Sequence, residues 1–303
     1  MYRTTAREIL LFNRVDPLLF GYFAWPESQE PRTIKEAGSG LFIAPRLGLS
    51  ARHLTKSFEK FDPQFDALNR RKSPLDAQYQ MKPVVCDFGS MIYQPTRWNP
   101  SPAGEDQILW KPLAGFGSFD TDIVSVLAEP RTRAAREREA DQRFFEWHML
   151  PPPVGSLVQV YGLPDQKIEV EGENHSVGAE VWWWNARVER HLRFHAHGFA
   201  DFPVYELHRK LPGGFSGAPV FYNDRLAGIF VGPAFVACLW PLALHTYCDP
   251  DGREYSFQEY FDTGFISVWD WGDVRGRVNR VPCDEVVAGL DVEPCTKTHV
   301  LLR

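Results

Sequence analysis

The stretch Gly213-Gly214-Phe215-Ser216-Gly217-Ala218-Pro219-Val220 places one serine between glycines, and an apolar run at residues 226–231 follows it. Glycine adopts backbone angles and permits close approaches that other residues resist. A serine hydroxyl becomes a nucleophile when a base takes its proton, and acyl transfer also needs donors that stabilise the oxyanion. Backbone N–H groups beside the serine are suited to the second task. The stretch therefore predicts a nucleophile, provided that the rest of the chain supplies a base.

Candidates for a base and its partner carboxylate lie upstream, each beside an apolar run. His53 ends the strand-like segment 47–53, and Asp122 directly precedes the apolar run 123–127. A catalytic histidine needs a carboxylate that fixes its tautomer and stabilises its charged form. Asp120 is the alternative carboxylate, because alternation places it on the same side of an extended chain. Asp122 is favoured, because it directly precedes the apolar run.

The order of these residues along the chain separates three unrelated serine hydrolases. In α/β-hydrolases the serine comes first within G-x-S-x-G, whereas this chain has Ala218 in place of the last glycine. The subtilisin order places Asp before His, and only Asp16 precedes His53. The order His, Asp, Ser is the chymotrypsin arrangement. Many short strands spaced by turns independently predict an all-β sandwich or barrel.

Several segments resemble motifs of the trypsin-like serine peptidases, in the order in which that family has them. The matching segments are 38–43 (the G-x-G strand), 49–53 (S/T-A-x-H), 122–127 (D-I-A-x-L), 155–164 (the strand that opens the second barrel, as in bacterial and intracellular members), 214–220 (G-x-S-G-G/A-P-V) and 226–229. Each match is weak alone, but together and in order they are specific. The resemblance covers roughly residues 35–270.

The resemblance implies an all-β fold, a chymotrypsin-like double β-barrel with a few helices, and a catalytic site between the barrels. It implies that Ser216 attacks a peptide carbonyl, that His53 takes its proton and that Asp122 orients His53. The backbone N–H groups of Gly214 and Ser216 would form the oxyanion hole. We therefore expect a serine endopeptidase of a bacterial type, acting on a protein or peptide through an acyl-enzyme. The alternatives are a non-catalytic protein-binding module on the same fold and, less favoured by chain order, a small-ester hydrolase.

The chain divides in two at a segment of different composition. Residues 131–147 are rich in Ala, Arg and Glu and lack Gly and Pro, which predicts an exposed helix, and three prolines at 151–153 end it. The predicted organisation is an N-terminal barrel at 1–130 with His53 and Asp122, a helical linker at 131–153, a C-terminal barrel at 154–280 with Ser216, and a tail at 281–303.

Apolar runs between turn signals predict the individual elements. We expect a strand pair at 9–12 and 18–25, a helical segment at 54–72, and a loop at 115–119. Further strands are expected at 38–45, 47–53, 84–86, 91–93, 123–127, 155–162, 168–170, 181–184, 192–194, 226–231 and 264–268.

Two departures from the family bear on control and specificity. Phe215 stands where animal digestive members have an Asp that pairs with a freed N-terminus, and no cleavable R-[IV]-[IV]-G-G start exists. We therefore expect no activation by trimming, and either narrow selectivity or a regulatory protein or ligand activator. The floor of the primary pocket falls at Lys210, beside His208 and Arg209, which predicts a preference for an acidic side chain before the cut. Phe230 and Val231 are the predicted pocket wall.

Bulk properties exclude other classes. A net charge of −6 and a pI near 5.9 argue against nucleic-acid binding. No apolar run approaches the ~18–20 residues of a membrane helix, and the charged N-terminus lacks the features of a secretory signal. Five scattered cysteines without a CxxC pair predict reduced thiols and a cytoplasmic location. His191, His195 and His197 lack a nearby carboxylate or thiolate, so no metal or cofactor is expected. The aromatic run 182–184 is typical of barrel packing.

Overall fold

The computed structural model describes residues 6–26, 36–56, 59–61, 80–86, 88–95, 104–117, 121–164, 166–171, 174–178, 181–194, 202–239, 242, 246–248, 254–256 and 293–294. The predicted strand at 264–268, the alternative carboxylate Asp120, and His195 and His197 lie outside these residues. Within the described residues no helix is both long and apolar enough to cross a membrane.

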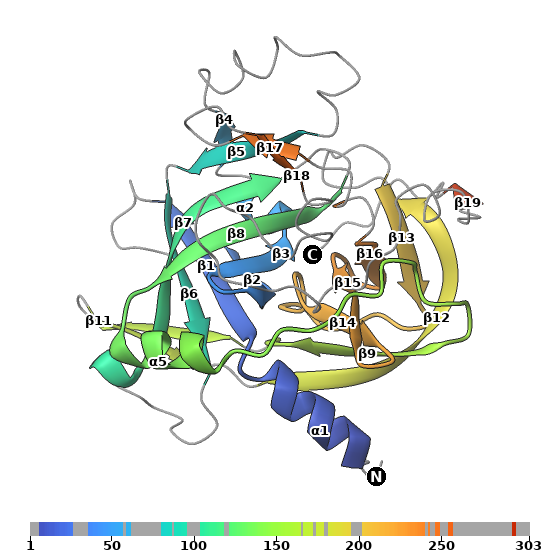
Figure 1. Ribbon diagram of the computed structural model, residues 1–303, viewed down its shortest axis with the longest axis horizontal. Coiled ribbons are helices and arrows are strands. Elements are labelled where there is room, and N and C mark those ends of the chain that lie inside the picture. The colour runs from blue at the N-terminus through green and yellow to red at the C-terminus, as the bar shows by residue number, and fades with distance from the viewer. Residues whose placement is uncertain are drawn as a thin grey trace.

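Six antiparallel strands close into a first barrel (Figure 1). They are β1 (Leu19–Pro26), β2 (Glu36–Ala44), β3 (Leu47–Ala51), β6 (Phe88–Gln94), β7 (Ile108–Gly117) and β8 (Ile123–Pro130). The spatial order β7-β6-β1-β2-β3-β8 is closed because β8 also pairs with β7. Every residue of β3, and every residue of β8 before its last two, is buried. The runs at 47–51 and 123–127 are therefore buried strands of the barrel, whereas the predicted strand at 47–53 is too long, because His53 begins the helix α2 (His53–Lys56).

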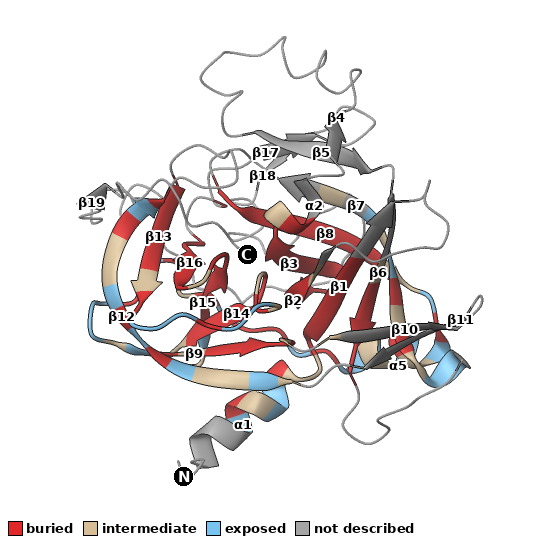
Figure 2. Ribbon diagram, turned by 180° about the vertical axis from the view of Figure 1, so that it is seen from behind, coloured by how far each residue is buried: buried red, intermediate tan, exposed pale blue. Residues whose placement is uncertain are grey.

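A second barrel is built in the same way from the later part of the chain. Its strands are β9 (Leu157–Gly162), β12 (Trp182–Phe194), β13 (Phe202–Leu207), β14 (Pro219–Tyr222), β15 (Arg225–Phe230) and β16 (Phe235–Ala237). The order β13-β16-β15-β14-β9-β12 closes through pairing of β12 with β13. Buried and exposed residues alternate along the end of β12 (Figure 2). Two closed six-stranded antiparallel barrels define a chymotrypsin-like double β-barrel, as the sequence predicted.

Short elements surround the barrels. In the described part of the chain the helices are α1 (Ala6–Val15), α2 (His53–Lys56) and α5 (Arg133–Asp141), with one 3-10 turn η1 (Gly104–Asp106). The strands β4 (Glu59–Phe61), β5 (Gln80–Cys86), β17 (Thr246–Cys248) and β18 (Glu254–Ser256) extend the sheet of the first barrel. A separate hairpin joins β10 (Lys167–Glu171) to β11 (Asn174–Gly178), and β19 (Glu293–Pro294) pairs with β12.

The predicted strand pair near the N-terminus is wrong in its first half. Residues 9–12 belong to the helix α1, and only the second half forms a strand, β1. Leu11 and Val15 are buried and stand one helical turn apart, which is the spacing of an amphipathic helix with one buried face. A short apolar run does not by itself distinguish a buried strand from a helix with one buried face.

Two further expectations fail where pairing between strands overrides local sequence. The helical segment predicted at 54–72 ends with α2 at Lys56, and residues 59–61 form β4 paired with β5; residues 62–79 lie outside the described part. The loop predicted at 115–119 is strand up to Gly117, because β7 pairs with β8 there to close the barrel. Backbone hydrogen bonds from a neighbouring strand decide both cases.

The segment predicted as a helix over 131–147 is helical only in α5. Thr132 caps it, since its hydroxyl accepts a hydrogen bond from the Ala135 N–H at 3.3 Å. The chain then runs extended, and Trp147 forms an isolated bridge with Leu226 of the second barrel. Phe144, Phe145 and Trp147 are buried, so this stretch is tied to the core rather than exposed.

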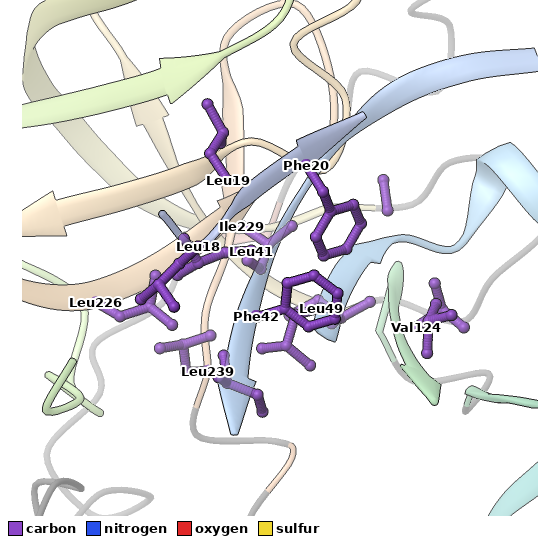
Figure 3. Packing of buried hydrophobic residues seen from close by; sticks show 14 of the residues in the cluster. Leu18, Leu19, Phe20, Leu41, Phe42, Leu49, Val124, Leu226, Ile229 and Leu239 are labelled. Carbon is purple, nitrogen blue, oxygen red and sulfur yellow. The ribbon is translucent and has the colours of Figure 1, made fainter. Parts of the chain in front are cut away.

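One apolar cluster runs through both barrels. Leu18, Leu41 and Phe42 of the N-terminal half belong to the same cluster as Leu226 and Ile229 of β15. Figure 3 shows these side chains side by side. A second, smaller cluster lies within the C-terminal barrel. The interface between the barrels is therefore a continuation of the core.

Candidate active site

His53 and Asp122 meet because β3 and β8 pair at their ends. Ala51 is opposite Ile123, so the residues that leave β3 and enter β8 lie together, and the Arg52 N–H donates to the Asp122 backbone carbonyl at 3.0 Å. The Asp122 carboxylate is buried and binds His53 twice. Its Oδ2 lies 2.7 Å from His53 Nδ1, and its Oδ1 accepts the His53 backbone N–H at 2.7 Å. A carboxylate at Nδ1 favours the tautomer that leaves Nε2 as the acceptor.

Ser216 reaches this pair from the other barrel. It lies in the turn before β14, and its Oγ is 3.0 Å from His53 Nε2. Gly217 follows with φ of 85°, and a Cβ at this position would overlap the carbonyl oxygen of Ser39 in β2. Only glycine satisfies both conditions, which explains why the nucleophile turn can dock so closely on the first barrel. The three side chains predicted from the sequence thus lie in one hydrogen-bonded chain.

The backbone of the turn is held through its carbonyl groups. The Gly214 carbonyl accepts the Ser39 hydroxyl at 3.0 Å, and the Ser216 carbonyl accepts the Ser39 N–H at 2.7 Å. Within the described part of the chain, no acceptor engages the N–H groups of Gly214 and Ser216. These are the two donors predicted for the oxyanion hole, and both belong to the turn that carries the nucleophile.

Phe215 anchors the turn in the second barrel. Its side chain is fully buried, and its ring meets that of Phe230 edge-on at a centroid distance of 6.4 Å. A Cβ on Gly162 of β9 would lie 2.6 Å from the Phe215 ring, so that glycine leaves the space that the ring occupies. The turn is therefore held by apolar burial at Phe215.

The predicted pocket residues fall in two different settings. Lys210 is exposed, whereas Phe230 and Val231 are buried in the second barrel. Phe230 faces the nucleophile turn through its backbone, since its carbonyl accepts the Gly217 N–H at 2.8 Å. The Leu211 N–H donates to the Pro233 carbonyl at 2.7 Å, which joins the segment after Lys210 to the β15–β16 connection.

His191 and Trp183, two further residues that the sequence singled out, make structural contacts. The His191 ring nitrogen Nε2 is 2.8 Å from the Pro152 carbonyl, and Trp183 packs its ring against Phe12 of α1 at 5.1 Å. Among the described residues, no group of three or more His, Cys, Asp or Glu side chains is arranged to hold a metal ion. Sequence reasoning missed Ser39, which it included only as part of a glycine-rich strand motif.

The sequence matches no protein-family model and no curated protein. Among solved structures, the chain is similar to Rv3671c of M. tuberculosis. A mutant in an inactive form gives a TM-score of 0.45 at 13% identity, covering 77% of this chain and 86% of that one. The Rv3671c protease gives 0.43 at 15% identity in an inactive form, covering 77% and 89%, and 0.47 at 14% identity in its active form, covering 80% and 89%.

Proposed function

We propose that this protein is a trypsin-like serine endopeptidase that hydrolyses peptide bonds through an acyl-enzyme on Ser216. The observation that carries the proposal is the continuous hydrogen-bonded chain from Asp122 through His53 to Ser216, built from both barrels. A serine, a histidine and a buried carboxylate in this geometry are the parts that nucleophilic acyl transfer requires.

The proposed reaction has two stages. The Ser216 Oγ attacks the substrate carbonyl while His53 Nε2 takes the hydroxyl proton, and the resulting oxyanion binds the N–H groups of Gly214 and Ser216. His53 then gives the proton to the leaving amine as the C–N bond breaks, which leaves an ester on Ser216. Water attacks that ester with His53 again as base, and the ester bond breaks to release the acid and regenerate the Ser216 hydroxyl. Asp122 holds His53 in its tautomer and stabilises the imidazolium in both stages.

A fluorophosphonate probe tests the nucleophile directly. Wild-type protein is expected to label, and Ser216→Ala is expected to lose all labelling. Ser125→Ala is the matched control, because Ser125 is buried in β8 and its hydroxyl finds no hydrogen-bond partner among the residues that the structure describes. Wild type that stays unlabelled both alone and with cell lysate added would contradict the hydrolase and favour the protein-binding module.

We further propose that the enzyme is restrained by narrow selectivity or by a regulatory protein or ligand. The apolar anchor at Phe215 supports this, because it leaves no position for a charged N-terminus to order the turn. Purified protein is therefore expected to leave casein and other unfolded proteins largely intact. Broad digestion without any added factor would contradict the restraint, while labelling that rises on addition of lysate would favour an activator over selectivity.

The proposed cleavage preference is an acidic residue before the cut. The support is the exposed Lys210 a few residues before the nucleophile turn, with Arg209 and His208 beside it. An exposed cation attracts a carboxylate only modestly, by about 0.2–1 kcal/mol, so the preference is expected to be a few-fold. A peptide library checks it, and Lys210→Ala is expected to remove it. Preferred cleavage after Arg or a large aromatic would show that Lys210 does not face the substrate.

A further inference from the structure

We propose that Ser39 is a positioning residue that sets the oxyanion-binding turn from the opposite barrel. This inference rests on the proposed peptidase function and adds to it a residue outside the Asp122–His53–Ser216 chain. Ser39 lies in β2 of the first barrel, and the turn it contacts belongs to the second barrel.

All three polar groups of Ser39 are engaged, although the residue is fully buried. Its hydroxyl donates to the Gly214 carbonyl at 3.0 Å and accepts the Leu163 N–H at 2.9 Å. Its backbone N–H donates to the Ser216 carbonyl at 2.7 Å. A hydroxyl can donate one hydrogen bond and accept others, so a single side chain satisfies two backbone groups of the second barrel here.

Ser39 is itself held on both sides. The Ser50 hydroxyl of β3 donates to the Ser39 carbonyl at 2.7 Å. On the second barrel, the Gln166 side-chain amide donates to the carbonyls of Gly38 and Leu163, each at 2.9 Å. The contact between Ser39 and Leu163 is therefore fixed by a hydrogen bond from Ser50 of the first barrel and by hydrogen bonds from Gln166 of the second.

The Gly214 carbonyl lies between the two predicted oxyanion donors along the chain, so holding it fixes the turn that connects them. Gly214 has φ of 84°, and a Cβ there would lie 2.5 Å from the Pro164 carbonyl oxygen. The residue is thus enclosed by the Ser39 hydroxyl on one side and the chain after β9 on the other. Removing the hydroxyl leaves the Gly214 carbonyl and the Leu163 N–H without this partner, and the turn can shift to recover one.

Ser39 makes no contact with the His53 ring or the Asp122 carboxylate through any of these bonds. Its role is therefore separable from that of the base. Loss of one oxyanion donor costs about 10²–10³-fold in kcat, and a misplacement of 1 Å costs about 10²-fold. A turn that is displaced but still present is expected to lose less than this maximum.

The test compares peptide hydrolysis by wild type, Ser39→Ala, Ser39→Cys and the control Ser125→Ala, with thermal unfolding measured on each. We expect Ser39→Ala to lower kcat by about 10- to 100-fold with KM within about threefold of wild type. The pH profile of kcat/KM is expected to keep its wild-type midpoints. Ser39→Cys keeps a weaker donor and acceptor in place, so its kcat is expected between those of wild type and Ser39→Ala. Ser125→Ala is expected to keep wild-type kinetics.

Several results would overturn the proposal. Unchanged kcat in folded Ser39→Ala, or in Ser39→Cys if the alanine variant does not fold, would show that the turn does not need the hydroxyl. A shifted pH profile would place Ser39 in the environment of the base instead. An equal loss in Ser125→Ala would assign the effect to general destabilisation of the barrel. Wild type that neither labels with fluorophosphonate nor cleaves peptide would remove the peptidase function, and this inference with it.

Discussion

Asp122 combines full burial with two short hydrogen bonds to one partner. Removing a carboxylate from water is costly unless hydrogen bonds replace its hydration. Here both oxygens bind His53, one through the ring and one through the backbone N–H. The same residue thus fixes the position of the histidine along the chain and the orientation of its ring. A carboxylate that only balanced the imidazolium charge would need just the first of these contacts.

Replacement of Asp122 by Asn is expected to keep the fold and to remove most activity. The amide retains the shape and can accept the His53 N–H, but it favours the wrong imidazole tautomer, with Nε2 protonated toward Ser216. A fall in kcat of about 10⁴-fold is expected. Peptide hydrolysis measures it, with circular dichroism as the check on folding. A fall of less than about tenfold would show that His53 can act as the base without this carboxylate.

Phe215→Ala is expected to lower both stability and activity. Truncation of a buried Phe costs about 3–5 kcal/mol of unfolding free energy, because a cavity replaces the ring between β9 and β15. The turn would lose its anchor, so fluorophosphonate labelling is expected to slow as well. Phe215→Leu refills most of the space and is expected to restore both. Urea denaturation and labelling rates provide the two readouts. Normal labelling in a destabilised Phe215→Ala would show that Ser216 reacts without the buried Phe215 ring.

Sequence reasoning identified the residues whose chemistry is unusual, and it could not identify those whose role depends on position. A serine among glycines and a histidine after a strand are visible as patterns. Ser39 carries no such signal, since its importance arises from Gly214 and Leu163, which approach it only in the folded barrels. The nature of the anchor at Phe215 also required the structure, because burial against Gly162 is a property of packing.

At the scale of elements, the helix α1 packs against the second barrel. Phe12 contacts the rings of Tyr161 and Trp183 at centroid distances of 6.1 and 5.1 Å, and the Arg14 guanidinium lies 4.4 Å above the Phe145 ring. These partners belong to β9, β12 and the segment that crosses between barrels. The helix therefore adds to the contacts between the two halves of the chain.

Phe12→Ala is expected to destabilise the protein by about 2 kcal/mol, since a half-buried ring loses burial and two aromatic contacts. Leu10→Ala on the same helix is the matched control, because Leu10 is 65% exposed and a change there is expected within about 0.5 kcal/mol. Urea denaturation compares the two. Equal effects would show that packing of Phe12 does not explain the loss, because both changes are to Ala, the best helix former.

Two buried groups, Tyr205 of β13 and Cys238 directly after β16, give an expected pH dependence. Burial raises the pKa of the Cys238 thiol, and burial followed by proximity to Cys238 raises the pKa of Tyr205. Both groups stay neutral in the folded state, whereas in the unfolded chain they ionise near about 8.5 and 10. Their contribution to stability is therefore full below pH about 8.5 and is lost as the pH rises further. Cys238→Ala is expected to show a shallower fall of the urea midpoint above that pH, and an unchanged slope would contradict this.

Errors in predicting elements share one cause. The runs at 9–12, 59–61 and 115–117 were assigned from their own residues, but their states depend on partners distant in sequence. Leu11 and Val15 form a helix face because both are buried, and β7 is strand up to Gly117 because β8 must find a partner to close the barrel. The strand β8 was predicted correctly over 123–127, because a mainly apolar run there indicates burial on both faces of the strand.

At the scale of the whole molecule, the barrels are joined by more than the active site. The main apolar cluster includes residues of both, and the bridge of Trp147 to Leu226 ties the crossing segment to the second barrel. The sequence predicted two barrels with a helical linker between them, and composition alone does not reveal how much core they share. Because His53 and Ser216 stand on opposite sides of this interface, its stability limits the activity of the proposed enzyme.

A shared core predicts a single unfolding transition. Tryptophan fluorescence, near-ultraviolet circular dichroism and fluorophosphonate labelling of Ser216 are expected to give one urea midpoint, because opening the interface would expose Leu41, Leu226 and their neighbours to water. Trp110→Ala, which removes a buried ring from the first barrel, is expected to move all three midpoints together. Labelling that disappears well before the fluorescence change would show instead that the barrels separate while each stays folded, and would identify the interface as the weakest part of the fold.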